Sequence, residues 1–271
     1  MKIDLHVHTK YSDGNLDLDE VLSLAAKTNI KEISITDHDT VIRLKDYTDL
    51  GKKHGLVLVP GIEIPTSIDG MHLLGYGITN FEKVENSLMK LKEYNEKQNI
   101  YTIEALQEMG VDISYRELKK KSIDGIISYR DIIKYLAEHK YVENARDAYK
   151  KYIGEGQKAY FPSVALDKKE VIELIKDSGG IVSLAHPGTL PEWMNQEELV
   201  NELIKEGLDA IEIYPPRLKD SEIKLYSMMA KKYDLLTTIG TDFHDYKTDK
   251  LGVEVSEEFL DKFNEKVLVK K

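Results

Sequence analysis

The feature that most limits how this chain can fold is an alternation of short apolar runs with amphipathic helical segments. The runs are rich in Ile, Val and Leu and predict seven strands, at 3–8, 33–37, 57–63, 71–77, 181–185, 209–214 and 236–241. Helical periodicity follows most of them, around 18–25, 43–54, 168–178, 196–206 and 220–233. Such repeated units indicate an α/β fold, either a closed barrel or an open doubly wound sheet. Of these two we favour the barrel.

One long segment breaks the alternation. Between Gly77 and Asp167 the chain shows helical periodicity and no strand pattern. Within it, Ser114 and Glu117 have the spacing of a capping box, which predicts the start of a helix. We therefore expect a helical insertion. The charged stretch after Gly252 receives no assignment.

The overall charge and the absence of cysteine exclude several classes of protein. The 271 residues include 48 Asp and Glu against 38 Lys and Arg, so the net charge of −10 provides no basic field for duplex DNA. With no cysteine, disulfides and thiolate metal sites are excluded, and a reducing compartment is favoured. No apolar run suggests a signal peptide or a membrane span. We expect a cytoplasmic protein without membrane contact, and its oligomeric state stays open.

Six of the eight histidines lie at the edges of the predicted strands. His6 and His8 alternate on the first strand, so their imidazoles point to the same face. In parallel α/β folds, bound molecules lie beyond the carboxyl ends of the strands. In this sequence Asp and Glu residues accompany the histidines at the predicted strand ends. The candidate metal ligands are His6, His8, Asp13, His38, Glu63, His72, His186, Asp242 and His244. The other two histidines, His54 and His139, are expected at the surface.

Imidazole and carboxylate ligands suit Zn²⁺, Mn²⁺ or Fe²⁺, and Glu63 is the candidate for a carboxylate that bridges two ions. Two or three adjacent divalent ions favour in-line displacement at phosphorus. The predicted nucleophile is a metal-bound hydroxide rather than a protein side chain, because the sequence has no cysteine and no Gly-x-Ser-x-Gly motif.

These motifs resemble, in order and over almost the whole chain, those of the PHP (polymerase and histidinol phosphatase) family. The segments that carry the resemblance are His6-Val7-His8, Ser12-Asp13-Gly14, Ile35-Thr36-Asp37-His38-Asp39, Gly61-Ile62-Glu63-Ile64, His72-Leu73-Leu74-Gly75-Tyr76, Ala185-His186-Pro187-Gly188 and Gly240-Thr241-Asp242-Phe243-His244. The resemblance implies a distorted seven-stranded, TIM-like β/α barrel with a trinuclear metal site. The barrel would comprise residues 1–80 and 163–271, with the helical insertion 81–162 over the active site.

The resemblance also implies how the ligands are shared among the ions. One ion would take His6, His8, Glu63 and Asp242, a second Asp13, His38 and His244, and a third Glu63 and His72. His186 would complete the site. In relatives of the TrpH-like subgroup a histidine from the insertion also binds the third ion. Asp131 stands at that position here and is a further candidate metal ligand, since an aspartate can also bind the ion.

Three basic residues are candidates for binding the substrate phosphate. Arg130 and Lys158 lie in insertion segments that resemble the same subgroup, and Arg217 follows a predicted strand. Each has a structural alternative, since Arg130 and Lys158 could lie on a solvated face and Arg217 could pair with Asp220.

The sequence thus predicts a phosphoric ester hydrolase acting on a small phosphorylated substrate. The subgroup suggests a nucleoside 3',5'-bisphosphate phosphatase or a 5'-to-3' exonuclease on short oligoribonucleotides. A phosphatase of sugar or amino-alcohol phosphates, such as histidinol phosphate, is an alternative within the same family. An alternative of another class is a non-catalytic, metal-binding regulatory module.

Overall fold

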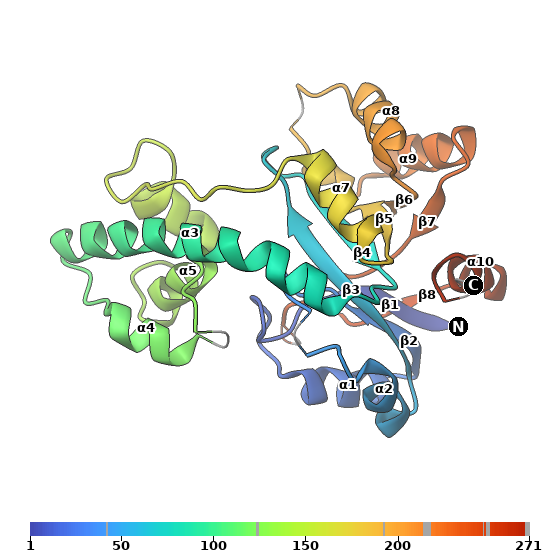
Figure 1. Ribbon diagram of the computed structural model, residues 1–271, viewed down its shortest axis with the longest axis horizontal. Coiled ribbons are helices and arrows are strands. Elements are labelled where there is room, and N and C mark those ends of the chain that lie inside the picture. Colours follow the sequence, from blue (N-terminus) through green and yellow to red (C-terminus); the bar gives the residue numbers. More distant parts are fainter. Residues whose placement is uncertain are drawn as a thin grey trace. The chain divides into compact units, whose positions relative to one another are not determined.

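The chain folds into two compact units (Figure 1). The computed structural model describes residues 1–41, 43–122, 125–191, 193–213, 218–245, 247 and 250–268. Met1–Glu85 and Leu166–Lys271 form one unit, here called the barrel unit, and Asn86–Ala165 form the other, the insertion unit. That the insertion is a domain over the active site stays a prediction.

The barrel unit contains one eight-stranded sheet in the order β7-β6-β5-β4-β3-β2-β1-β8. Its strands are β1 (Lys2–Val7), β2 (Ile30–Ile35), β3 (Val57–Pro65), β4 (His72–Tyr76), β5 (Ile181–Leu184), β6 (Ala210–Glu212), β7 (Leu236–Thr238) and β8 (Val253–Glu254). β1 to β3 are parallel, as are β5 to β7, whereas β4 runs antiparallel to both β3 and β5. All seven predicted strands are present, and β8 is an additional strand that the sequence did not predict.

The backbone beyond β7 closes the sheet onto β1. Leu5 N donates to Ile239 O at 3.2 Å, His8 N donates to Phe243 O at 2.8 Å, and Phe243 N donates to His6 O at 3.2 Å. The antiparallel β4 and this irregular closure distort the barrel. The prediction of a distorted β/α barrel is confirmed.

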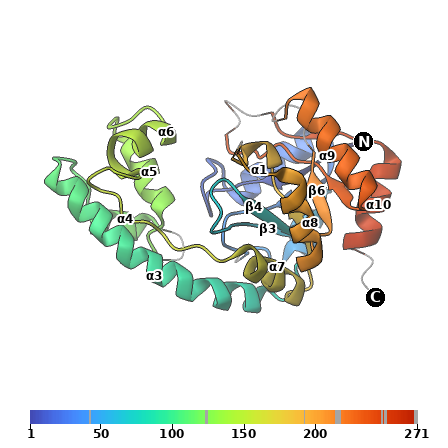
Figure 2. The same cartoon turned by 90° about the horizontal axis from the view of Figure 1, so that it is seen from above.

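Helices surround the strands of the barrel unit (Figure 2). They are α1 (Leu18–Lys27), α2 (Tyr47–His54), α7 (Lys168–Asp177), α8 (Gln196–Glu206), α9 (Asp220–Lys232) and α10 (Glu257–Val267), with a short 3-10 turn η2 (Pro187–Thr189). Their apolar stripes face the sheet; α10, for example, packs Phe263 and Val267 against Ile3, Leu5 and Tyr76. This packing keeps the strand ends, and hence the ligands, in fixed positions.

The described part of the insertion unit contains helices and no strand, as predicted. Its elements are α3 (Phe81–Glu108), which begins in the barrel unit, α4 (Tyr115–Lys121), α5 (Tyr129–Glu138), α6 (Ala145–Ala148) and the π-helical turn η1 (Tyr149–Ile153). α4 starts after Ser114 as expected, but the Ser114 side chain makes no capping hydrogen bond, so the predicted capping box is wrong. No described helix in either unit combines the length and apolarity that a bilayer crossing requires.

Candidate metal centre

The nine predicted ligands of the barrel unit lie close together. All except His72 come from the carboxyl ends of strands or the turns that follow, and His72 is the first residue of the antiparallel β4. Eight of them fall into three groups in which one ligand atom per residue lies within 4.8 Å of all the others. The first group is His6, His8, Glu63 and Asp242; the second is His8, Asp13, His38 and His244; the third is His38, Glu63 and His72. Each pair of groups shares one residue, so three ions held here would be neighbours.

Glu63 lies at the middle of the centre and is almost completely buried. Its Oε2 is 3.1 Å from the Nε2 atoms of both His6 and His8 and 3.4 Å from His38 Nε2. Its Oε1 is 2.7 Å from His72 Nδ1 and 2.8 Å from His186 Nε2. One carboxylate therefore contacts five imidazoles, which is the position that a bridging ligand requires.

Two observations show that these residues fit metal ions better than hydrogen bonds among themselves. A carboxylate oxygen has two lone pairs, yet Glu63 Oε2 faces three imidazole nitrogens. His8 Nε2 is buried 3.1 Å from both Glu63 Oε2 and Asp242 Oδ1 and makes no hydrogen bond of acceptable geometry. A cation among these atoms would satisfy all of them, and the nitrogen and oxygen donors suit Zn²⁺, Mn²⁺ or Fe²⁺.

The outer part of the centre is more open. Asp13 lies 3.3 Å from His244 Nε2 and 3.6 Å from both His8 Nδ1 and His38 Nε2, measured to its carboxylate oxygens. His244 Nδ1 donates to the backbone carbonyl of Asp242 at 2.8 Å, which leaves its Nε2 directed at Asp13. The side chains of Asp13 and His244 are 29% and 30% exposed, so solvent reaches this side of the centre.

His186 differs from the other predicted ligands because it belongs to none of the three groups. Its Nε2 contacts Glu63, and its Nδ1 is 2.9 Å from Thr189 Oγ1. The structure thus brings it to the centre through Glu63, and its role as a direct ligand stays a prediction.

The electrostatics of the centre couple imidazoles to carboxylates. Burial would lower the pKa of His8, but the carboxylates of Asp242 and Glu63 raise it to about 10. Burial would raise the pKa of Glu63, but the charges on His38 and His6 hold it well below its ordinary value. The carboxylates are therefore stable only beside positive charge, which protons or metal ions can supply.

Three buried carboxylates behind the ligands were not predicted from the sequence. Glu212, on β6, accepts a hydrogen bond from His6 Nδ1 at 3.0 Å. Asp37 accepts from Thr9 N and Ser12 Oγ, both at 2.7 Å. Asp4 accepts from Thr241 N at 2.9 Å and from Gly252 N at 2.8 Å, and burial raises its pKa to about 6. The available signal was an acidic residue within an apolar run, as in Ala210-Ile211-Glu212-Ile213.

Backbone strain accompanies two residues of the centre. His186 has φ 24° and ψ 60°, and Asp242 has φ 52°. Non-glycine residues rarely adopt positive φ, and the strain persists only where the surroundings enforce it. It turns both side chains toward the centre.

The residues predicted in the insertion have structural contacts within their own unit. Asp131 Oδ2 accepts from Ser128 N and Ser128 Oγ, both at 2.7 Å, in a capping box that starts α5. Arg130 lies half-buried in the same first turn, and Lys158 Nζ is 3.0 Å from the Glu108 carboxylate. Arg217 lies outside the described residues. The roles of these residues in metal or phosphate binding stay predictions.

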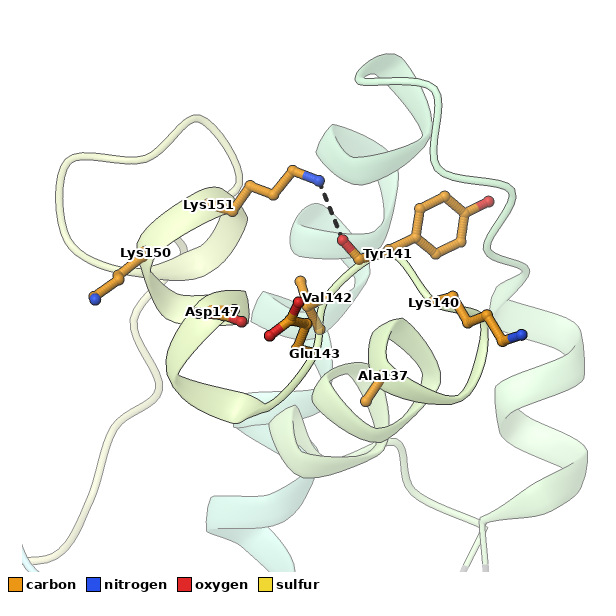
Figure 3. A pocket seen from close by; sticks show the side chains of 8 residues that line it. All are labelled: Ala137, Lys140, Tyr141, Val142, Glu143, Asp147, Lys150 and Lys151. Atoms are coloured by element: carbon orange, nitrogen blue, oxygen red, sulfur yellow. Dashed lines mark hydrogen bonds between the residues drawn. The ribbon is translucent and has the colours of Figure 1, made fainter.

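A pocket of about 900 Å³ in the insertion unit is separate from these candidates (Figure 3). The carboxylates of Glu143 and Asp147 lie near its middle, while Lys151 Nζ donates to Tyr141 O at 3.1 Å. Among the described residues predicted for the site, none lines this pocket.

One family model covers almost the whole chain. The model of the PHP domain matches residues 4–269. The chain belongs to the PHP domain family. This confirms the resemblance seen in the sequence.

Three curated relatives match most of the chain. The 5'-3' exoribonuclease of Haemophilus influenzae is 28% identical over 90% of this chain and 90% of its own length. The phosphoribosyl 1,2-cyclic phosphate 1,2-diphosphodiesterase of Eggerthella lenta is 26% identical over 89% of this chain and 93% of its own. The 3',5'-nucleoside bisphosphate phosphatase of Chromobacterium violaceum is 25% identical over 89% and 87%.

A solved structure supports the fold. It is of a protein from Bifidobacterium adolescentis whose assignment as a metal-dependent phosphoesterase is itself provisional, and it superposes with a TM-score of 0.85. The match covers 97% of this chain and 95% of that one at 24% identity. At this identity the likeness establishes the fold alone.

Proposed function

We propose that this protein is a metal-dependent phosphoesterase that hydrolyses small phosphate esters of nucleotides. The observation that carries the proposal is the convergence of three overlapping ligand groups on Glu63, in a chain of the PHP family. Two or three divalent ions of Mn, Zn or Fe, when bound, would supply an activated water and offset charge at phosphorus. The relatives named for exoribonuclease and nucleoside bisphosphate phosphatase activity favour a nucleotide or a short oligoribonucleotide as substrate.

The chain's own residues would hold the ligands in place before substrate arrives. Asp37 fixes the turn that presents Asp13, because its carboxylate binds Thr9 N and Ser12 Oγ. Asp4 fixes the turn that presents Asp242, because it binds Thr241 N and Oγ1. Preorganised ligands need not reorder when substrate binds.

Two hydroxyl groups close to the predicted ligands, on Thr9 and Ser12, donate hydrogen bonds to Asp37. Thr9 Oγ1 donates to Asp37 at 2.6 Å, and Ser12 Oγ donates to the same carboxylate. Ser12 Oγ also lies 3.4 Å from His8 Nδ1, but its own proton is directed at Asp37, which favours a solvent-derived nucleophile. The predicted contacts of Arg130, Lys158 and Arg217 with phosphate belong to this proposal, as does a cytoplasmic location.

A substrate panel tests the proposal. Protein stripped with chelator and reloaded with Mn²⁺ should release phosphate from a nucleoside 3',5'-bisphosphate, or mononucleotides from a 5'-phosphorylated RNA tetramer, and His8→Ala should do neither. Preference for histidinol phosphate would favour the amino-alcohol phosphatase alternative. A cyclic phosphodiester belongs in the panel because of the Eggerthella relative. If the loaded protein hydrolysed no phosphomonoester or phosphodiester, the non-catalytic alternative would replace the proposal.

A further inference from the structure

Glu212 joins two ligand-bearing segments that are far apart in the sequence. Its Oε1 accepts from His6 Nδ1 at 3.0 Å, and its Oε2 accepts from the backbone N of His186 at 2.7 Å. The residue is 2% exposed. Since both oxygens are used by the protein, and since Glu212 belongs to none of the three ligand groups found among the described residues, it lies behind the centre rather than in it.

The first contact determines which nitrogen of His6 can bind a metal. A neutral imidazole carries one N–H and one lone pair. With the proton held on Nδ1 by Glu212, the lone pair is on Nε2, which lies 3.1 Å from Glu63 Oε2 and 3.4 Å from Asp242 Oδ1. Glu212 therefore selects the form of His6 that the first group requires.

The second contact holds a strained residue. His186 has φ 24°, a conformation that costs energy unless neighbouring groups enforce it. The hydrogen bond from its backbone N to Glu212 is one such constraint, and it directs the ring so that Nε2 reaches Glu63 Oε1 at 2.8 Å. Glu212 and Glu63 thus hold His6 and His186 between them.

We propose that Glu212 is a positioning residue that fixes the His6 tautomer and the His186 backbone together, and thereby sets the affinity of the first ligand group for its metal ion. The inference rests on the metal centre of the proposed function, but not on any substrate. Carboxylates behind metal-binding histidines typically contribute 10- to 100-fold to metal affinity.

Binding of Co²⁺ alone tests this role, because Co²⁺ reports both affinity and ligand geometry through its visible absorption. Glu212→Gln keeps the size of the side chain, but its amide can accept at one position only and presents N–H to the other donor. We expect Co²⁺ affinity to fall about 10- to 100-fold and the absorption bands to shift. The matched control is Glu32→Gln, which changes another buried sheet carboxylate, bonded to Asn264, and should leave both readouts unchanged. Wild-type affinity and an unchanged spectrum in Glu212→Gln would overturn the proposal.

A second measurement uses the wild-type protein and so does not depend on the folding of the variant. In the Zn²⁺-loaded protein, long-range ¹H–¹⁵N correlations of the His6 ring should place its proton on Nδ1. A proton on His6 Nε2 would contradict the role of Glu212. Neither experiment measures hydrolysis, so failure of the phosphoesterase proposal and failure of this inference are distinguishable.

Discussion

His8 is shared by the first and second ligand groups, because its Nε2 faces Glu63 and Asp242 while its Nδ1 faces Asp13. Asp242 belongs to the first group only. We therefore expect His8→Ala to lower binding at two ions and Asp242→Ala to weaken mainly one, with turnover abolished in both. Metal content after dialysis, measured by mass spectrometry beside phosphate release, distinguishes the two variants.

The control for both variants is His54→Ala. His54 lies on α2 and contacts Asp19 at 3.0 Å, outside the centre, so its removal should leave metal content and turnover unchanged. Full metal content in His8→Ala would refute the assignment of the first two groups.

At the scale of residues, the sequence located side chains whose position follows from their strand. His6 and His8 share a face because side chains alternate along a strand, and His38 and Glu63 meet because parallel strands end together. Glu212 was missed because its contact with His6 spans 206 residues of sequence, and the apolar run around Glu212 indicates burial without indicating the partner.

Closure of the barrel requires a glycine at position 240. A Cβ atom there would lie 2.3 Å from His6 Cβ and 2.4 Å from His6 N. The backbone of β1 cannot move away from this Cβ atom without displacing His6. Gly240→Ala should therefore destabilise the protein by about 1–3 kcal/mol and reduce metal affinity. Thermal unfolding and Co²⁺ titration measure the two effects.

Gly55→Ala provides the comparison. Gly55 has φ 70° and no atom within 4 Å of an added Cβ, so the substitution should cost about 1–2 kcal/mol of backbone strain and leave metal affinity unchanged. Equal metal affinity in Gly240→Ala and wild type would show that the closure does not position His6.

The link between β2 and α10 should make stability depend on pH. Glu32 is buried on β2, accepts from Asn264 Nδ2 at 2.9 Å, and burial raises its pKa from 4.5 to about 7. The unfolded chain loses this proton first as pH rises, so stability falls through the interval from 4.5 to about 7. Glu32→Gln should therefore stabilise the metal-free protein by about 3 kcal/mol at pH 8 and little at pH 4.

Urea unfolding followed by circular dichroism at the two pH values measures this difference. Glu257→Gln, an exposed substitution on α10, should leave the pH dependence as in wild type. An identical slope in Glu32→Gln would contradict burial of an ionisable group at this position.

The C-terminal elements show what limited prediction at this scale. β8 has two residues, too few for any periodicity, and it is defined only by its pairing with β1. α10 is recognisable in retrospect, since Ser256 caps its start and Leu260, Phe263 and Val267 form its buried stripe. Acidic and basic residues between these positions hid the stripe in a charged segment.

At the scale of the molecule, charge is divided unevenly between the two units. Residues 86–165 carry 14 Lys and Arg against 12 Asp and Glu, a net charge of +2, whereas the chain as a whole carries −10. The barrel unit therefore carries −12. This excess of negative charge favours cations at the centre.

Removal of metal should lower the stability of the barrel unit more than that of the insertion unit, because the predicted ligand groups lie in the barrel unit. Ions bound only to the folded centre stabilise the fold by about 2.7 kcal/mol at free metal one hundred times the dissociation constant. The insertion unit has its own buried cluster, including Leu106, Ile132 and Leu136, so we expect its stability to be independent of the ligands of the barrel unit. Hydrogen exchange of the Mn²⁺-loaded and chelator-stripped proteins should differ in β1, β3 and β4 and agree in α4.

At the start of α5, the backbone amide of Ser128 provides a separate test of Asp131, since this amide donates to the Asp131 carboxylate. Metal-dependent exchange at Ser128 would support Asp131 as a ligand, and metal-dependent exchange throughout α4 would contradict the independence of the two units.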